Sequence, residues 1–251
     1  MNFAAYPSLR GMPVLITGGA SGIGADMVRA FHGQGARVAF LDIQDQAAQD
    51  LIADTDGAPI YRHADVTDIP ALQAAIADIA CEIGPLRTLV NNAANDKREA
   101  VADITPEDWD RAQAINLRPH FFAAQAVRPG MAAAGGGTII NLSSVAWRLG
   151  SGDIAPYVTA KAGILGLTRS LATALGPDNI RVNAIEPGAV MTERQRALWF
   201  KTEAKVQAMV DRQSLKRVLT GDEIARTALF LASDDARMIT KQTFIVDAGL
   251  A

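Results

Sequence analysis

The chain has little of what marks secreted, membrane-bound or nucleic-acid-binding proteins. It carries one cysteine, Cys81, so it forms no internal disulfide, and no redox or metal motif surrounds this thiol. No stretch approaches the roughly 18 uninterrupted apolar residues of a membrane span, and residues 1–11 lack the apolar core of a secretory signal. The net charge of -3 and the lack of a basic run give no support for nucleic-acid binding. We expect a cytoplasmic protein that contacts neither membrane nor nucleic acid.

Metal ligands are also scarce. The histidines, His32, His63 and His120, stand far apart, and no pair has the spacing of a metal site. Each is expected to be an ordinary surface or core side chain, and no metal is predicted.

What the chain does contain is an alternation of predicted strands and helices. Its 251 residues, 49% of them hydrophobic, suit one α/β domain with a large core. Strands that alternate with helices favour a parallel sheet covered on both faces, so we expect a doubly wound, Rossmann-type fold over residues 1–251. The predicted strands are Val14–Ile16, Ala36–Asp42, Pro59–His63, Thr88–Ala94, Thr138–Ser144, Ile180–Gly188 and Thr243–Val246, and the predicted helices end near Gln34 or span Pro70–Ile83, Pro106–Met131, Ala155–Leu175 and Asp222–Ala232.

A glycine-rich turn joins the first predicted strand to the first helix. The segment Thr17–Gly24 reads TGGASGIG. Glycines there allow a tight bend, close approach of the backbone to a pyrophosphate, and amides that face negative charge at a helix N-terminus. The next strand ends at Asp42, 18 positions after Gly24 (42 − 24), where a carboxylate accepts hydrogen bonds from ribose hydroxyls. The combination predicts a dinucleotide site.

A tyrosine and a lysine on one predicted helix are the second chemical signal. Tyr157 and Lys161 stand four residues apart, so they share a face of the helix Ala155–Leu175. A phenol titrates near pH ~10, and an opposite charge within about 4–6 Å lowers that by roughly 1–3 units. We therefore expect Lys161 to lower the pKa of Tyr157, which then exchanges protons with a substrate hydroxyl near neutral pH.

Polar residues interrupt the apolar pattern where the predicted strands end. In a doubly wound sheet these carboxyl ends share one edge, and ligands bind outside it. Turn chemistry explains single residues of this kind, but it explains less well why they fall at the edge that holds the glycine turn. The residues at this edge are Thr17, Asp42, Asp65, Asn91, Asn92, Ser143, Ser144 and Glu186.

These motifs, in this order, resemble those of the short-chain dehydrogenase/reductase family. The segments that carry the resemblance are TGGASGIG, ADVTD, NNAA, Ser144 with YVTAK, PGAVMT and VDAG, and they span nearly the whole chain. The resemblance implies an NAD(P)-dependent oxidoreductase. It assigns proton exchange to Tyr157, support of that tyrosine to Lys161, a hydrogen bond to the reacting oxygen to Ser144, and a helix bend that holds a water to Asn116. Ser143 is expected to serve structure.

The same resemblance implies a set of cofactor residues. We expect NAD in preference to NADP, because Asp42 repels a 2′-phosphate and its neighbour Ile43 supplies no cation. The cofactor residues expected besides Tyr157 and Lys161 are Gly18, Ser21, Gly22, Ile23, Gly24, Asp42, Ile43, Asp65, Val66, Asn92, Ala93, Pro187, Gly188, Val190 and Thr192.

Within the family, the chain looks most like bacterial aldose 1-dehydrogenases of the xylose and galactose type. The segments NNAANDKRE and TERQRALWF carry much of this likeness, and a substrate-binding segment is expected over about residues 190–215. A sugar requires many fixed hydrogen-bonding groups, because unpaired polar groups are costly. The residues expected to contact the substrate are Asn95, Ser144, Trp147, Glu186, Gln195 and Trp199, with Arg98 and Arg194 as further candidates.

The chain departs from the family pattern at three points, and several readings stay open. NNAA replaces NNAG, VDAG replaces VDGG, and Glu186 puts a charge before Pro187 and Gly188. A ketoacyl or hydroxysteroid reductase is the alternative enzyme, and an NAD-binding sensor without turnover is the alternative from another class. The resemblance also implies a homotetramer. The residues leave open which sugar is used and in which direction the reaction runs.

Overall fold

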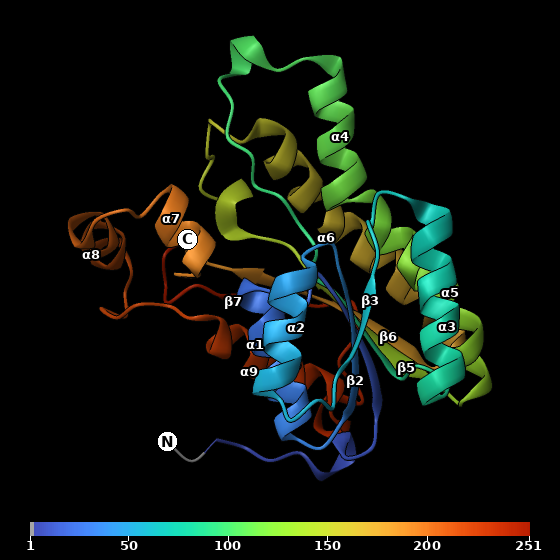
Figure 1. Cartoon of the computed structure of the whole chain (residues 1–251). Helices are drawn as coiled ribbons and strands as arrows, with labels where there is room; N and C mark the ends of the chain where they lie inside the picture. The colour runs from blue at the N-terminus through green and yellow to red at the C-terminus, as the bar shows by residue number, and fades with distance from the viewer. Residues whose placement is uncertain (1–2) are drawn as a thin grey trace.

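A parallel sheet of seven strands, in the order β3-β2-β1-β4-β5-β6-β7, forms the centre of the fold (Figure 1). The structure is a computed structural model that describes residues 3–251. The order reverses between β1 and β4, and a doubly wound sheet binds ligands at such a point, outside the carboxyl ends of the strands. The strands are β1 (Pro13–Thr17), β2 (Arg37–Asp42), β3 (Ile60–His63), β4 (Thr88–Asn91), β5 (Gly137–Leu142), β6 (Ile180–Pro187) and β7 (Thr243–Val246).

Helices cover both faces of the sheet. One face packs against α1 and α9, and the other packs against α3, α5 and α6. The helices are α1 (Gly22–Gly33), α2 (Asp45–Asp54), α3 (Ile69–Ile83), α4 (Pro106–Asn116), α5 (Arg118–Ala133), α6 (Ala155–Leu175), α7 (Glu193–Leu198), α8 (Glu203–Arg212) and α9 (Gly221–Ala232).

Strand β1 shows why the sequence forms this sheet. Every residue of β1 is buried, because successive side chains point to opposite faces and both faces are covered. Val14 and Ile16 belong to the core on the α1 and α9 side, and Leu15 belongs to the core on the other side. The predicted fold class, a single doubly wound α/β domain, is confirmed.

Some predicted elements differ from the structure. The long helix predicted over residues 106–131 is divided at Leu117, whose φ of -130° and ψ of -54° are not helical. Pro119 has no amide hydrogen, and the amide of His120 turns to the Leu117 carbonyl at 3.2 Å, so the helical bonding is interrupted. Helix α2 was not predicted from the sequence. The segment expected to bind substrate, residues 190–215, contains α7 and α8.

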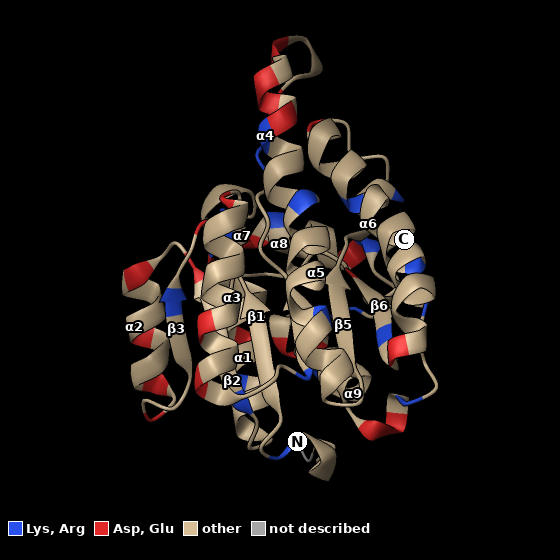
Figure 2. Ribbon diagram, turned by 90° about the vertical axis from the view of Figure 1, so that its right-hand side faces the viewer, with Lys and Arg blue, Asp and Glu red and all other residues tan. Residues whose placement is uncertain are grey.

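Charged side chains are distributed unevenly over the surface (Figure 2). Acidic residues gather on α2 and on the outer part of α4, whereas basic residues are scattered. Helix α2 contains Asp45, Asp50 and Asp54 and no lysine or arginine. Within residues 3–251, no helix is both long enough and apolar enough to cross a membrane.

The single cysteine lies at the end of the molecule opposite the carboxyl ends of the strands. Cys81 is exposed near the C-terminus of α3. Helix α3 begins beside the carboxyl end of β3 and runs back to the start of β4. Its C-terminal turn is therefore remote from the carboxyl edge of the sheet.

Candidate active site

A cleft of about 1320 Å³ follows the carboxyl edge of the sheet. It brings together the glycine turn, the ends of the central strands, one face of α6 and the segment around α7. The predicted residues that line the cleft are Gly18, Ser21, Gly22, Ile23, Gly24, Asp42, Ile43, Asp65, Val66, Asn92, Ala93, Asn95, Ser144, Tyr157, Lys161, Pro187, Gly188, Val190, Thr192 and Gln195. Four others do not line it: Asn116, Trp147, Glu186 and Trp199.

The turn between β1 and α1 leaves no room for a side chain at Gly18 or Gly24. Gly18 has a φ of +66°, a backbone conformation that favours glycine, and a Cβ atom there would lie 2.7 Å from the Ala93 Cα atom. A Cβ atom on Gly24 would lie 1.9 Å from the Gly18 carbonyl oxygen. Backbone amides and the N-terminus of α1 therefore border the cleft directly, an arrangement that fits a pyrophosphate.

Asn92 fixes this turn to the end of β4. Its side-chain amide donates hydrogen bonds to the carbonyls of Thr17 at 3.1 Å and Gly18 at 2.8 Å. Asn91 is buried and donates to Asn141 Oδ1 at 2.9 Å, so its side chain joins β4 to β5. Asn91 thus serves structure, whereas Asn92 shapes the cleft.

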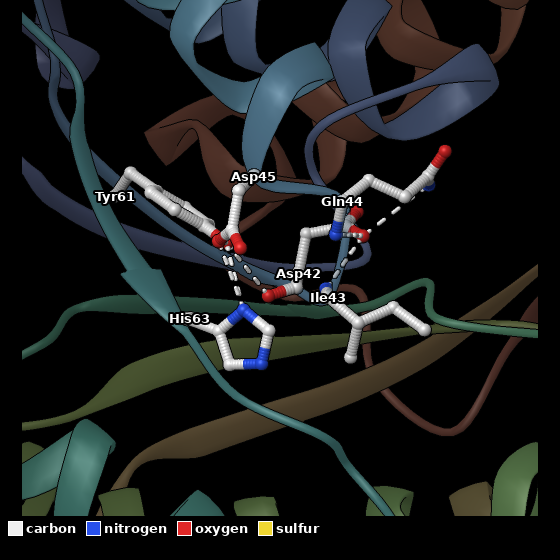
Figure 3. A network of polar contacts seen from close by, with 6 residues as sticks. All are labelled: Asp42, Ile43, Gln44, Asp45, Tyr61 and His63. Carbon is white, nitrogen blue, oxygen red and sulfur yellow. Dashed lines mark hydrogen bonds and ion pairs between the residues drawn. The ribbon is translucent and has the colours of Figure 1, made fainter.

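Asp42 ends β2 at the centre of a polar network (Figure 3). Its Oδ1 atom accepts hydrogen bonds from the amides of Ile43 at 2.8 Å and Gln44 at 3.0 Å, and its Oδ2 atom accepts one from the Ala20 amide at 2.9 Å. The carboxylate thereby joins the end of β2 to the glycine turn and is aimed along the cleft. Gln44 Nε2 also donates to Oδ1 at 3.3 Å, so the lone pair that can accept a bond from a ribose hydroxyl is on Oδ2.

Two further side chains extend this network away from Asp42. The Tyr61 hydroxyl donates to Asp45 Oδ1 at 2.5 Å, and the His63 ring approaches the same oxygen at 2.9 Å. These contacts hold Asp45 at the start of α2, where its negative charge adds to that of Asp42. Burial and the Asp45 carboxylate raise the pKa of Tyr61 above its usual value, so this phenol stays neutral.

Lys161 lies beneath Tyr157 on α6, beside the end of β5. Its Nζ atom donates a hydrogen bond to the Leu142 carbonyl at 2.8 Å and lies 5.5 Å from the centroid of the Tyr157 ring. Lys161 is 1% exposed, and burial lowers its pKa to about 7 against the opposing effect of the Asp96 carboxylate. The predicted neighbourhood of phenol and ammonium is present.

The predicted lowering of the Tyr157 pKa is not found in the protein alone. Desolvation raises the pKa of Tyr157 above its ordinary value, the Asp96 carboxylate raises it further, and a hydrogen bond with Ser144 lowers it. The helical spacing of Tyr157 and Lys161 predicts only the effect of the lysine charge. The loss of water around the phenol and the negative charge of Asp96 both raise the pKa of Tyr157, and the spacing does not report them.

The two serines after β5 have different surroundings. Ser143 is buried and donates its hydroxyl hydrogen to the Lys161 carbonyl at 2.7 Å, a bond that joins β5 to α6. Ser144 lines the cleft beside Tyr157, and its Oγ atom accepts a hydrogen bond from the Ala146 amide at 3.1 Å. In the protein alone, Ser144 directs its hydroxyl hydrogen to the Tyr157 oxygen, the direction of bond that lowers the pKa of the phenol.

Asn116 lies at the break between α4 and α5, as the predicted bend requires. It is fully buried; its Oδ1 atom accepts from the Asn95 amide at 2.9 Å, and its Nδ2 atom donates to the Asn95 carbonyl at 3.1 Å. The side chain therefore holds the segment after β4 in place. Because the His120 amide bonds to the Leu117 carbonyl, the Asn116 carbonyl lacks its usual helical partner.

Glu186 and Trp147 are corrections to the predicted substrate contacts. Glu186 is 0% exposed at the end of β6. Its carboxylate accepts hydrogen bonds from Trp147 Nε1 at 2.8 Å and from Arg148 Nε and Nη2 at 2.8 and 3.0 Å. A buried charge needs such partners, and these come from the turn just after Ser144. Glu186 and Trp147 therefore stabilise the turn after Ser144, and neither side chain lines the cleft.

Trp199 is a third correction, since it packs outside the cleft. The Arg98 guanidinium lies 4.1 Å from the centroid of the Trp199 ring, and Arg98 Nη1 pairs with Asp153 Oδ2 at 3.0 Å. Arg98 itself lines the cleft together with Asn95, Arg194 and Gln195. Asp96, which sequence reasoning missed, lies among them; its one signal was a carboxylate just beyond the end of a central strand. Among residues 3–251, no group of three His, Cys, Asp or Glu side chains is placed to hold a metal.

Over nearly its whole length, the chain is similar to known proteins. Residues 18–251 match a family model described as enoyl-(acyl carrier protein) reductase. The chain is 49% identical to a probable galactose dehydrogenase of Rhizobium meliloti (strain 1021), covering 98% of this chain and 97% of that protein. It is 47% identical to a D-xylose 1-dehydrogenase of Caulobacter vibrioides (strain NA1000 / CB15N), covering 99% of each.

A solved structure gives the same result for the fold. The crystal structure of a putative short-chain alcohol dehydrogenase from Sinorhizobium meliloti 1021 superposes with a TM-score of 0.90 at 34% sequence identity. The superposition covers 97% of this chain and 98% of that one. The likeness therefore extends over nearly the whole fold.

Proposed function

Since the chain belongs to the short-chain dehydrogenase/reductase family and is an oxidoreductase with a nicotinamide cofactor, we propose that it oxidises the C1 hydroxyl of a free aldose to the aldonolactone with NAD. The observation that carries the proposal is the near full-length identity to two sugar dehydrogenases, 49% and 47%. The polar end of the cleft supports it independently.

A sugar needs the hydrogen-bonding groups that surround Tyr157 and Ser144. A polyol gives up water on entering a cleft, and each unpaired polar group then costs about 1–3 kcal/mol. Asn95, Asp96 and Gln195 bring amide and carboxylate groups to this end of the cleft. A steroid or an acyl chain would favour a more apolar lining, so the polar groups argue for an aldose.

The side chains of this cleft suit proton removal from a hydroxyl. Ser144 would donate a hydrogen bond to the reacting oxygen, and Tyr157 would take its proton. Lys161 would hold positive charge beneath the phenol, and the free Asn116 carbonyl would accept a hydrogen bond from a water that leads the proton away. When bound, an oxidised nicotinamide would supply the hydride acceptor and a positive charge that favours the phenolate of Tyr157.

The choice of NAD rests on the charges around the end of β2. Asp42 and Asp45 are both carboxylates, α2 carries no cation, and Gln44 bonds to Ser21 Oγ at 3.0 Å across the turn. A 2′-phosphate would meet repulsion here, whereas ribose hydroxyls would donate to Asp42. Steady-state kinetics should therefore give a kcat/KM for NAD at least about tenfold above that for NADP.

The test of substrate class is a panel of reactions followed by NADH formation. Xylose, arabinose, galactose, glucose and fucose are compared with hydroxysteroid and 3-hydroxyacyl substrates under one set of conditions. We expect turnover with at least one aldose and lactone as the product. Turnover confined to a steroid or acyl substrate would replace the sugar with that substrate, and cofactor binding without any turnover would favour the sensor.

The oligomeric state and localisation are part of the same proposal: we propose that the protein is a homotetramer in the cytoplasm. Gly163 and Gly166 lie exposed on α6, and a Cβ atom on Gly166 would meet nothing within 4 Å, so a second helix can approach closely there. Phe121 on α5 and Trp109 on α4 are 41% and 40% exposed nearby in the fold and offer apolar area. Light scattering should give four times the 26.5 kDa chain mass at micromolar concentration.

A further inference from the structure

Helix α7 borders the cleft but has no core of its own. None of its residues is buried, and together with α8 it stands out on one side of the sheet (Figure 1). A segment with few buried apolar contacts opens at low cost in free energy unless polar contacts hold it. The polar contacts of α7 therefore decide whether it stays over the cleft.

Asp96 receives hydrogen bonds from two neighbouring residues of α7. Arg194 Nη2 donates to Asp96 Oδ1 at 3.1 Å, and Gln195 Nε2 donates to Asp96 Oδ2 at 2.7 Å. Arg194 Nη2 also reaches Asn95 Oδ1 at 3.0 Å. Asp96 follows β4 and its side chain is 18% exposed, so one nearly enclosed carboxylate joins the central sheet to α7.

The same carboxylate lines the cleft together with Tyr157 and Lys161. Its negative charge raises the pKa of both Tyr157 and Lys161. Around these two groups, Ser144 faces the phenol from the end of β5, Lys161 faces it from α6, and His120 on α5 approaches Lys161. Burial keeps His120 neutral by lowering its pKa, so Asp96 is the one negative charge identified beside the pair.

We propose that Asp96 is a positioning residue with two linked tasks: it latches α7 over the cleft, and it places a negative charge in the cleft wall that Tyr157 and Lys161 also line. The latch is independent of the reaction. The second task rests on the proposed proton chemistry. Because α7 and the proton-handling residues share one carboxylate, closure of the cleft and the electrostatics of catalysis depend on the same group.

The direction in which the pH profile of kcat should move follows from the negative charge that Asp96→Asn removes. A bell-shaped pH profile of kcat reports two macroscopic pKa values that belong to the pair of groups and not to either residue alone. Asp96→Asn removes a negative charge that raises both, so both limbs of the profile should move to lower pH. A residue that only fastened α7 would change the height of the profile and leave its position unchanged.

Three variants separate the two tasks. Asp96→Asn removes the charge and weakens the latch. Arg194→Met removes a latch contact and keeps the Asp96 charge. Glu203→Gln is the matched control, because Glu203 also pairs with an arginine of α7, Arg196, at 2.9 Å, but its side chain is 86% exposed. Amide hydrogen exchange of residues 193–198 measures the latch, and the pH profile of kcat measures the charge.

We expect exchange over residues 193–198 to rise in Asp96→Asn and Arg194→Met by roughly three- to tenfold, the loss expected for one or two hydrogen bonds. The pH profile should move to lower pH in Asp96→Asn alone, and Glu203→Gln should match the parent protein in both measurements. Unchanged exchange in both latch variants would overturn the latch. A profile of Asp96→Asn that stays in place would overturn the second task.

Failure of the proposed function can be told apart from failure of the latch. If no aldose is turned over, the exchange measurement still tests the latch, because it needs no substrate. The pH profile is then recorded with whichever alcohol the enzyme accepts.

Discussion

The turn between β1 and α1 and the helix α7 border the same cleft, yet different forces hold them. The turn is closely packed where its glycines meet, so that even one added carbon atom at Gly24 would collide with the Gly18 carbonyl oxygen. Helix α7 has no buried residue and depends on hydrogen bonds to Asp96. A site that binds one constant cofactor suits close packing, and a site that must admit a substrate suits contacts that can break.

Tyr157→Phe should have the largest effect, because Tyr157 lies where the two regions meet. The change keeps the ring and removes the exchangeable proton, so kcat should fall by about 10³-fold. Stopped-flow or steady-state assays measure the loss, and fluorescence titration with NADH supplies the control. A variant that binds NADH normally and retains near-native turnover would exclude Tyr157 as the proton-exchanging residue.

Gly24→Ala tests the closely packed region. The new Cβ atom would lie 1.9 Å from the Gly18 oxygen, so the turn must move, and misplacement of about 1 Å can cost on the order of 100-fold. The Kd for NADH should rise by about that factor. Gly33→Ala is the matched control on the same helix, since a Cβ atom there meets nothing within 4 Å; it should bind NADH as the parent does.

The contrast between these regions also explains what the sequence could and could not predict. The glycine turn, Asp42, and the spacing of Tyr157 and Lys161 follow from local pattern, because strand and helix periods place them. Glu186 has the same strand-end position, but its partners Trp147 and Arg148 lie 39 and 38 residues away in sequence. Asp96 bonds to residues about 100 positions later, and no local pattern reports such contacts.

A pair of arginine substitutions compares buried and exposed ion pairs directly. Arg148→Met leaves the fully buried Glu186 without its main partner and should lower the free energy of unfolding by about 3 kcal/mol. Arg196→Met breaks the exposed pair with Glu203 and should cost at most about 0.5 kcal/mol. Urea unfolding measures both. Equal losses would contradict the distinction between the buried and the exposed ion pair.

Lys161→Met should show that burial of the Lys161 ammonium lowers the stability of the folded protein. Burial lowers the Lys161 pKa to about 7, below its unfolded value near ~10.4, so the unfolded state binds more protons between these values. The parent protein should therefore gain stability as pH rises from about 7 to 10. At pH 7 and below, the variant should be more stable by about 1 kcal/mol, after loss of the bond to Leu142.

That stability gap should close near pH ~8 and reverse above it, because the parent gains about 1.4 kcal/mol per pH unit between pH ~7 and ~10. Thermal or urea unfolding at pH 6, 8 and 10 follows the gap. A constant difference in stability across this pH range would mean that the charge on Lys161 does not destabilise the folded protein.

The position of Cys81 has a practical consequence. It is the one thiol of the chain, it is exposed, and it lies where α3 approaches the edge of the sheet opposite the cleft. A thiol-reactive surface would therefore capture every molecule in the same orientation, with the mouth of the cleft turned toward the solution. For an immobilised biosensor, this chain already has its attachment point and needs no engineered one.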